Sequence, residues 1–148
     1  LVYVALRFKH WDFAMAGVIA LVHDVLVALG VTVALGHQID LLTVTALLTI
    51  AGFSINDTIV IYDRIRENMA KSHKYNLRDI INLSLNQTLS RTILTSFTVL
   101  MVTVALYLRG GEVLNTFSLC LIIGFIAGTY STIYIAAPLV LAWQKKTK

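Results

Sequence analysis

The 148-residue chain has one cysteine, one proline and few charged side chains, and each scarcity excludes a class of protein. A lone Cys120 cannot form an intrachain disulfide or a cysteine-based metal cluster, and in its apolar run it is expected to be a small packing residue. One proline and eight glycines leave little room for a Pro/Gly-rich linker. Charged residues make up 14% of the chain, against about 25% in soluble domains, so a soluble globular domain is a poor fit.

Catalytic and metal-binding motifs are also missing. The four histidines are scattered, and none belongs to an HExxH zinc motif. The chain contains neither a GxSxG nucleophile motif nor a glycine-rich loop of the kind that binds phosphate. We therefore expect that the protein is not an enzyme and that it holds no metal and no organic cofactor.

Hydrophobic residues, in contrast, make up 57% of the chain and gather in long runs. A transmembrane helix needs about 20 mostly apolar residues, and four stretches meet this requirement. The sequence therefore predicts an all-α fold, a polytopic bundle of transmembrane helices. The complete spans are predicted at residues 13–35, 41–62, 89–108 and 116–143, with tight turns at 36–40 and 109–114. Residues 1–9 are interpreted as the end of another span, which suggests a fragment of a longer polypeptide.

Basic residues indicate how these spans are oriented. Under this topology eleven of the twelve lysines and arginines fall on one side of the membrane, and Arg109 alone falls on the other. Lysine and arginine accumulate on the cytoplasmic side of membrane proteins. We therefore predict a cytoplasmic C-terminus and a cytoplasmic connection at residues 63–92. The net charge of +4 follows from this topology, so no nucleic-acid partner is expected.

The long connection contains an amphipathic segment. Leucine or isoleucine recurs at every fourth position from Leu77 to Leu89, which places an apolar stripe on one face of a helix. The pattern predicts a cytoplasmic amphipathic helix over residues 77–90 that lies on the membrane or packs under the bundle and runs into the third span. The alternative is a solvated linker with incidental leucines.

Three charged residues lie within or beside the spans and need partners, because a charge at the middle of a membrane costs at least about 2.5 kcal/mol. They are Asp24, Asp57 and Arg91. The helix from Asp40 at the outer turn to Asp57 is about 25 Å long, and the helix from Arg109 back to Arg91 is about 27 Å long. The two side chains therefore lie at nearly the same depth on consecutive antiparallel helices, and the sequence predicts that they can pair.

A buried carboxylate beside an arginine can act in two ways. If the pair opens and closes as helices move, Asp57 can take up and release a proton and couple it to conformational change. Asn56 beside it, and Thr95 one turn beyond Arg91, are polar groups that can complete such a proton pathway. The alternative is a static ion pair that fixes the register of two helices.

Two further patterns concern packing inside the bundle. His23 and Asp24, near the middle of the first span, form a candidate secondary polar pair, for which a structural hydrogen bond is the favoured interpretation. Gly124 and Gly128 form a GxxxG motif in the fourth span, and such small residues allow two helices to approach closely.

The stretch GFSINDTIVIYDRIREN, at residues 52–68, is similar to a long signature of a known family. Together with ALVHDVLVALG, SLNQTLSRTILTS and LYLRGGEVLNTFSL, it makes the chain closely resemble the SecF subunits of the SecD–SecF protein-export family. The resemblance covers essentially all 148 residues. Resistance-nodulation-division exporters, a related group, have a similar Gly-x-x-x-Asp-Asp helix but lack DRIREN and the SLNQTLSRT segment.

This resemblance implies a membrane subunit of the Sec translocation machinery that uses the proton-motive force to assist the export of preproteins. The four spans would be helices three to six of six, and residues 1–9 the end of helix two. The first helix and an outer domain, through which the unfolded preprotein would be contacted, would lie outside this chain. Asp57 and Arg91 match positions assigned to the family's proton pathway, with the proton as the coupling ion.

The same resemblance implies partners and a location. The partners would be SecD, the SecYEG channel, SecA and accessory proteins of the YajC and YidC types, and the location would be the bacterial inner membrane. Two alternatives stay open at this point. One is a proton-coupled small-molecule exporter of the resistance-nodulation-division type, and the other is a structural scaffold of the translocon that conducts no protons.

Overall fold

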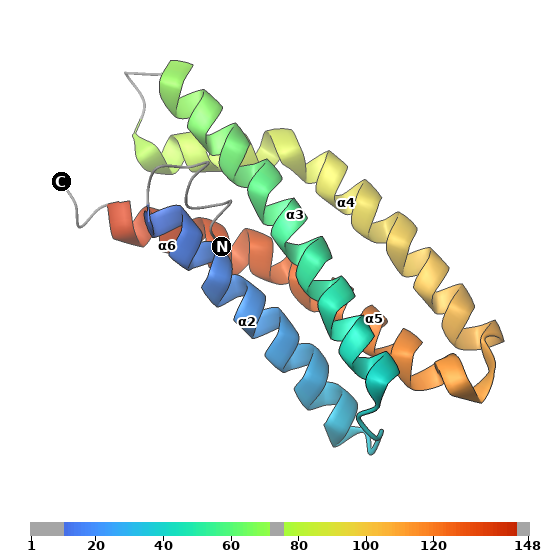
Figure 1. The fold of residues 1–148 in the computed structure, drawn as a ribbon. Coiled ribbons are helices and arrows are strands. Elements are labelled where there is room, and N and C mark those ends of the chain that lie inside the picture. The colour runs from blue at the N-terminus through green and yellow to red at the C-terminus, as the bar shows by residue number, and fades with distance from the viewer. Residues whose placement is uncertain (1–10, 72–75, 145–148) are drawn as a thin grey trace.

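The computed structural model describes residues 11–71 and 76–144 as a bundle of packed helices (Figure 1). In chain order these are α2 (Trp11–Ala34), α3 (Leu41–Lys71), α4 (Leu77–Arg109), α5 (Gly111–Ser131), a π-helical segment η1 (Thr132–Ala136) and α6 (Ala137–Gln144). α5, η1 and α6 follow one another without a break and pass behind α3 in the view of Figure 1. The predicted end of another span at residues 1–9 lies outside the described residues.

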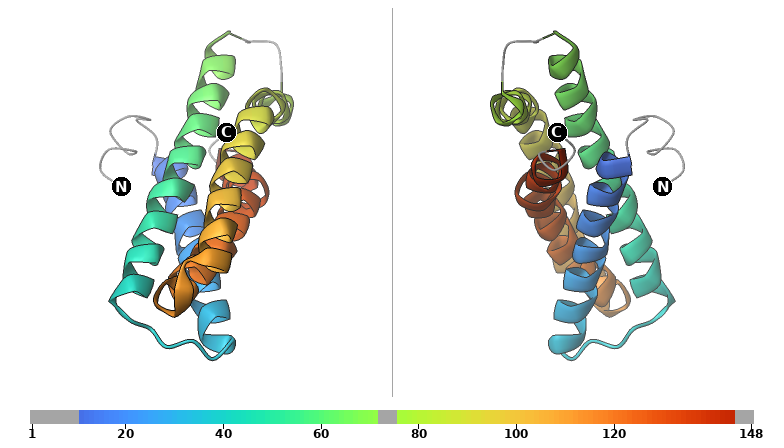
Figure 2. Two further views of the ribbon diagram at one scale, coloured as in Figure 1. Left: turned by 90° about the vertical axis from the view of Figure 1, so that its right-hand side faces the viewer. Right: turned by 90° about the vertical axis from the view of Figure 1, so that its left-hand side faces the viewer.

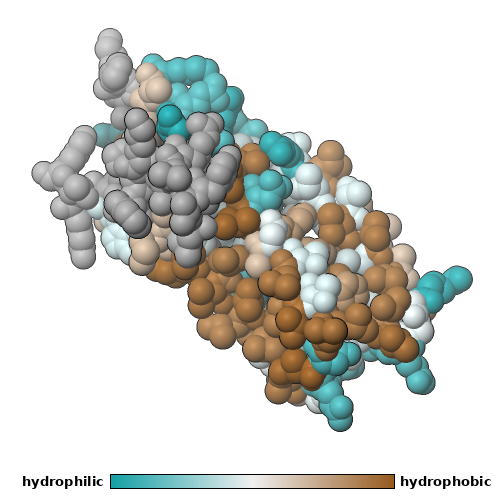
Figure 3. Space-filling view, viewed as in Figure 1, coloured by the Kyte–Doolittle hydropathy of each residue, from teal (hydrophilic) through white to brown (hydrophobic). Residues whose placement is uncertain are grey.

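Four helical runs are long and apolar enough to cross a membrane. They are Phe13–Ala34, Leu41–Lys71, Leu77–Arg109 and Gly111–Trp143. Apolar side chains cover much of the visible surface, and hydrophilic side chains gather toward its two ends (Figure 3). A helix satisfies its own backbone hydrogen bonds, which is the condition for crossing the bilayer core. The predicted membrane helical bundle is therefore confirmed.

The helices extend beyond the predicted spans. α3 and α4 have 31 and 33 residues, or about 46 and 50 Å of helix, whereas the hydrocarbon core of a bilayer is about 30 Å thick. The predicted ranges 41–62 and 89–108 therefore cover only the apolar parts of these helices. The fourth run begins at Gly111 rather than at residue 116, because a φ of 74° at this glycine lets the chain reverse at once. The predicted turn at 109–114 is thus too long.

The amphipathic segment at residues 77–90 forms the first part of α4 and is continuous with the third span. Figures 1 and 2 show these first turns running across the bundle before the helix turns along it. The hydroxyls of Ser84 and Thr88 donate to backbone carbonyls four residues earlier, at 2.7 and 2.9 Å, an arrangement that often bends helices. Ile81 is buried and Leu85 packs beside it in a core cluster with side chains of α2, α3 and α6. The segment therefore packs under the bundle.

A short turn joins α2 to α3 at the opposite end. Gly36 has a φ of 82°, a left-handed conformation that ends a helix at little cost in glycine. Asp40 caps α3: its Oδ1 accepts hydrogen bonds from the hydroxyl and the backbone N–H of Thr43, each at 2.7 Å. These bonds stabilise the carboxylate and hold the pKa of Asp40 below its ordinary value of 3.8. His37 Nδ1 lies 2.9 Å from the Thr116 hydroxyl, which links this turn to the start of α5.

Small residues on α5 let it occupy the centre of the bundle. A Cβ added at Gly124 would overlap the side chain of Ile50 on α3. A Cβ added at Gly128 would lie 3.6 Å from both Asp24 Oδ2 of α2 and Ser54 Cβ of α3. The GxxxG motif is therefore the place where α5 meets both neighbours, and Gly128 lies directly beside a buried carboxylate.

Candidate functional site

The side chain of Asp24 is fully buried at the point where α2, α3 and α5 meet. The hydroxyl of Ser54 on α3 donates to Asp24 Oδ2 at 2.5 Å, and the hydroxyl of Ser131 on α5 donates to the same oxygen at 2.8 Å. Burying a charge is costly unless hydrogen-bond donors replace the water that it loses. The two serines supply this replacement, so the three helices are held together around one carboxyl group.

His23 contacts the other oxygen of this carboxyl. Its Nδ1 lies 3.2 Å from Asp24 Oδ1, and the His23 side chain is 36% exposed while that of Asp24 is fully buried. The predicted polar pair is therefore in contact in the structure, although adjacent residues on a helix point in different directions. Through His23, the buried carboxyl reaches the outer face of α2.

Ser131 stands at a change in helix type. It is the last residue of α5, and the π-helical segment η1 begins at the next residue. Its hydroxyl also lies 3.1 Å from the carbonyl oxygen of Gly128, which further accepts hydrogen bonds from the Thr132 hydroxyl at 2.8 Å and from the Thr132 backbone N–H. Single π turns inside α-helices are rare and are frequent at functional sites. His23, Asp24, Ser54 and Ser131 together form what we call the Asp24 cluster. Through Ser131, this cluster is joined directly to an irregular helix turn.

Asp57 is a second buried carboxyl, three residues beyond Ser54 along α3. Its side chain is 5% exposed, and among the described residues its Oδ2 has no hydrogen-bond partner. Within residues 11–71 and 76–144, two further buried hydroxyls have no hydrogen-bond partner: that of Thr58, on the side of α3 that packs against α2, and that of Thr92 on α4. Buried polar atoms of this kind usually bond to ordered water or take part in function. The interior around Asp57 is therefore suited to hold water or a proton.

Arg91 lies within electrostatic range of Asp57, but in the described part of the chain no hydrogen bond or ion pair within 4 Å joins them. Arg91 is exposed and lines a groove together with side chains of α3, so it lies beside α3 without being buried against Asp57. Asn56 is exposed too, so it and Asp57 point to different faces of α3. Thr95 is exposed, and its hydroxyl donates to the Arg91 carbonyl at 3.0 Å. The role of these residues in a proton pathway stays a prediction.

A polar groove leads from this region toward the end of the bundle where α3 ends and α4 begins. Its volume is about 360 Å³. The groove is lined by Val60, Asp63, Arg64, Glu67, Gln87, Thr88 and Arg91. Because it contains charged side chains of both signs at the hydrophilic end of two spanning helices, water can enter as far as Arg91.

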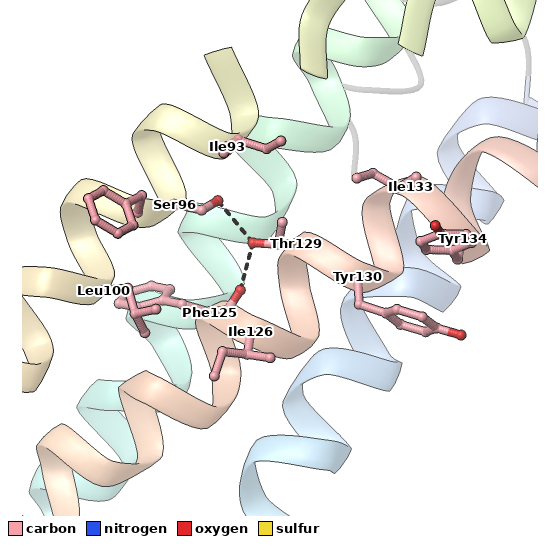
Figure 4. A pocket seen from close by; sticks show the side chains of 10 residues that line it. Ile93, Ser96, Leu100, Phe125, Ile126, Thr129, Tyr130, Ile133 and Tyr134 are labelled. Carbon is pink, nitrogen blue, oxygen red and sulfur yellow. Dashed lines mark hydrogen bonds between the residues drawn. The ribbon is translucent and has the colours of Figure 1, made fainter. Parts of the chain in front are cut away.

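A second groove, of about 400 Å³, lies between α4 and α5 and is almost entirely apolar (Figure 4). Its one side-chain hydrogen bond between the two helices joins the hydroxyls of Thr129 and Ser96 at 2.9 Å. The side chains of Tyr130 and Tyr134 stack beside it, with ring centroids 5.0 Å apart. The groove holds none of the carboxyl groups, so it is separate from the candidate site.

Sequence reasoning missed Ser54 and Ser131 as members of the site. Serine is common in membrane helices, and only its partner shows whether it packs or binds. A signal did exist for Ser54, because residues three apart lie on the same helix face and Ser54 precedes Asp57 by three positions. Within residues 11–71 and 76–144, His, Cys, Asp and Glu side chains do not gather in groups of three that could hold a metal ion.

The sequence matches a known protein family over almost its whole length. The family model of the C-terminal region of the protein-export membrane proteins SecD and SecF matches residues 1–146. The chain belongs to this family. Its relatives include the protein translocase subunits SecF of Rickettsia akari and Rickettsia prowazekii, which are 53% and 52% identical to it over 146 residues. Both matches cover 99% of this chain and 47% of the relative, so the chain spans about half the length of these curated relatives.

Solved structures of SecD/SecF family members agree with the fold. A SecDF in a super-membrane-facing form matches 99% of the chain with a TM-score of 0.93 and 45% identity. SecDF of Thermus thermophilus, described as a translocon-associated membrane protein, matches 97% with a TM-score of 0.92 and 46% identity. In each case the match covers 20% of the SecDF chain. These relatives are transport proteins, and the membrane character of the chain follows from its family and its four spans.

Proposed function

We propose that this chain is the proton-responsive membrane part of a SecF-type translocase subunit, which uses the proton-motive force to assist the export of preproteins. The proposal rests mainly on the surroundings of the Asp57 carboxyl group. This carboxyl is buried in a spanning helix, one of its oxygens has no hydrogen-bond partner in the part of the chain that the structure describes, and the charge of Arg91 is close by. A carboxyl that lacks fixed donors can exchange a proton without first breaking a hydrogen bond.

The energy available is sufficient for such a role. One elementary charge that crosses 100 mV gains about 2.3 kcal/mol, which is enough to shift the balance between two arrangements of a helix bundle. The polar groove beside Arg91 supports the proposal further, because it gives protons a wet route to the region of Asp57. No metal or organic cofactor is needed, since the proton itself is the coupling ion.

The exposed polar residues support a second membrane chain as a partner. Asn56, Arg91 and Thr95 are exposed on helices long and apolar enough to span a membrane, and the amide of Asn56 would lose its hydrogen-bond partners if it faced lipid. A SecD subunit, fused or separate, would cover them. By the same reasoning from the family, SecYEG, SecA and accessory proteins of the YajC and YidC types are proposed as further partners. Preprotein would be contacted by parts of the protein outside this chain.

The proposed location is the bacterial inner membrane, with the C-terminus in the cytoplasm. The support is the distribution of basic residues, of which eleven of twelve fall on one side under the four-span topology. A small-molecule exporter of the resistance-nodulation-division type is disfavoured by the family match over residues 1–146. A scaffold that conducts no protons is the alternative that the experiment below separates from the proposal.

The test is preprotein export into inverted membrane vesicles that contain the full-length protein, with and without a proton-motive force. Asp57→Asn keeps the size of the side chain but cannot exchange a proton, so we expect the proton-driven part of export to disappear. Asp79→Asn is the matched control, because Asp79 is exposed in the first turn of α4 and should leave export unchanged. Both variants must accumulate normally. Undiminished proton dependence in Asp57→Asn would show that Asp57 only sets helix register.

A further inference from the structure

The Asp24 cluster is not used by the proton pathway proposed above, yet it contains the most deeply buried carboxyl of the described residues. Asp24 is fully buried, whereas Asp57 is 5% exposed. Its partners come from three helices, so a change at this carboxyl acts on α2, α3 and α5 together. A carboxyl group that only holds helices together needs one arrangement of hydrogen bonds. The groups around Asp24 allow two arrangements, one for each protonation state of its carboxyl.

In the first set, Asp24 is a carboxylate. Oδ2 accepts hydrogen bonds from the hydroxyls of Ser54 at 2.5 Å and Ser131 at 2.8 Å, and Oδ1 faces His23 Nδ1 at 3.2 Å. Both serine hydroxyls donate to one oxygen, so that oxygen has two hydrogen-bond donors in place of water. The Ser131 hydroxyl has a single proton and two acceptors within reach, Asp24 Oδ2 at 2.8 Å and the Gly128 carbonyl oxygen at 3.1 Å, and in this state the proton lies toward the shorter contact, with Asp24.

In the second set, Asp24 carries a proton on Oδ2. This O–H can donate to the Ser131 oxygen across the same 2.8 Å, and the Ser131 hydroxyl then turns to donate to the Gly128 carbonyl at 3.1 Å. Ser54 continues to donate to Oδ2. A hydroxyl is both a donor and an acceptor, so every group keeps a partner. Neither protonation state leaves a buried polar atom of this cluster unpaired.

The side chains that face Asp24 come from three helices and the π-helical segment, and few of them can take up or release a proton. On α2, the titratable neighbour is His23. α3 supplies Ser54, and Asp57 follows three residues further along the same helix. α5 supplies Ser131 and the backbone of Gly128, and η1 begins with Thr132, none of which carries a charge. Among the described residues, Asp24 is therefore opposed by no fixed cation, and His23 is the one titratable side chain in contact with it.

We propose that Asp24, Ser54 and Ser131 form a second proton-binding site in this chain, where uptake of a proton turns the Ser131 hydroxyl from Asp24 to the Gly128 carbonyl. The proton forms an O–H bond on Asp24 Oδ2 and leaves from the same oxygen. Because the Gly128 carbonyl already accepts bonds from Thr132 at the start of η1, the turn changes the hydrogen bonding of the π-helical segment. The site thus links protonation on α2 to the irregular turn after α5. The inference rests on the proposed proton-coupled function but concerns different residues.

Infrared difference spectra of the full-length protein, reconstituted with its partner subunit in liposomes, can test this site. Spectra recorded at acid and alkaline pH show the C=O stretch of each carboxyl that takes up a proton. Subtracting the Asp24→Asn difference spectrum from that of the wild type isolates Asp24. We expect one carboxylic-acid band to be lost in this variant, and a different band to be lost in Asp57→Asn. If this subtraction shows no carboxylic-acid band, so that the Asp24→Asn and wild-type difference spectra are the same, the proposal is overturned.

Ser131→Ala tests the geometry while Asp24 is kept. Removing the hydroxyl should move the Asp24 band, because the hydrogen bonding of the protonated carboxyl changes. Ser118→Ala is the matched control: Ser118 is also fully buried on α5, but its hydroxyl donates to the Leu114 carbonyl and not to a carboxyl. An unmoved band in Ser131→Ala, or an equal movement in Ser118→Ala, would contradict the site. If Asp24→Asn fails to accumulate, a carboxylic-acid band that moves in Ser131→Ala and not in Ser118→Ala still identifies the site, because of these two serines only Ser131 donates to a carboxyl group.

The two proposals can fail separately. If export does not depend on the proton-motive force but the Asp24 band is present, the proposed function is wrong and the proton-binding site stands. If export depends on protons through Asp57 while the Asp24→Asn subtraction shows no carboxylic-acid band, only the second site is wrong.

Discussion

Gly124 gives the sharpest test of how this bundle is held together. The three atoms nearest to a Cβ added at this position are Cδ1, Cγ1 and Cγ2, and all of them belong to Ile50. Ile50 is 1% exposed, and a β-branched side chain in a helix has one strongly preferred rotamer. It therefore cannot turn aside, and α3 and α5 must separate instead. We expect Gly124→Ala to destabilise the bundle by about 1–3 kcal/mol, the usual cost of overpacking.

Two other glycines provide a graded control for the same substitution. A Cβ at Gly128 would meet its neighbours at 3.6 Å, an ordinary contact distance, so Gly128→Ala should cost less. A Cβ at Gly52 meets nothing within 4 Å, and alanine is a better helix former than glycine by about 0.5–1 kcal/mol. Gly52→Ala should therefore be neutral or slightly stabilising. The order of the three variants depends only on what each added methyl group would contact.

The assay is reversible unfolding of the purified protein in mixed micelles, with helix content followed by circular dichroism. Ile50→Ala alone should cost about 2–5 kcal/mol, because it leaves a cavity in the core. In the double variant, the methyl group at position 124 partly fills that cavity, so the combined loss should be smaller than the sum of the single losses. Additive losses, or a Gly124→Ala variant as stable as the wild type, would refute the close approach of α3 and α5 at this point.

Two further predictions concern the ends of the helices. Thr43 holds the pKa of Asp40 below its ordinary value of 3.8, so the stabilising effect of this cap is fully present above that value and is lost as pH falls through the lower pKa of the folded protein. Acid unfolding curves should therefore be less steep for Asp40→Asn than for the wild type, and equal steepness would contradict the cap. Asn68 is buried and donates to the Ser84 hydroxyl at 2.8 Å and to Gln87 Oε1 at 2.9 Å, which fastens α3 to the start of α4. Asn68→Ala should cost about 1–3 kcal/mol in the micelle assay, whereas the exposed Asn86→Ala should cost little.

Much of the fold could be predicted because lipid imposes simple conditions on a sequence. A segment that crosses the bilayer core must bond its own backbone internally and must be apolar for about 20 residues. The four spans, their order and the turn at Gly36 follow from these conditions. Helix ends were less certain, since α3 and α4 continue past the bilayer into polar segments where hydropathy no longer marks them.

The sequence by itself thus determined the membrane bundle, the family and the presence of carboxyl groups inside the spans. Only the tertiary structure decided which way each polar side chain points. Spanning helices are apolar on all sides, so their pattern does not show which face is buried, and rotation is set by close packing such as that of Gly124 on Ile50. On α3, that packing turns Asn56 outward and Asp57 inward. It also brings Ser54 and Ser131, far apart in the chain, to the same oxygen of Asp24.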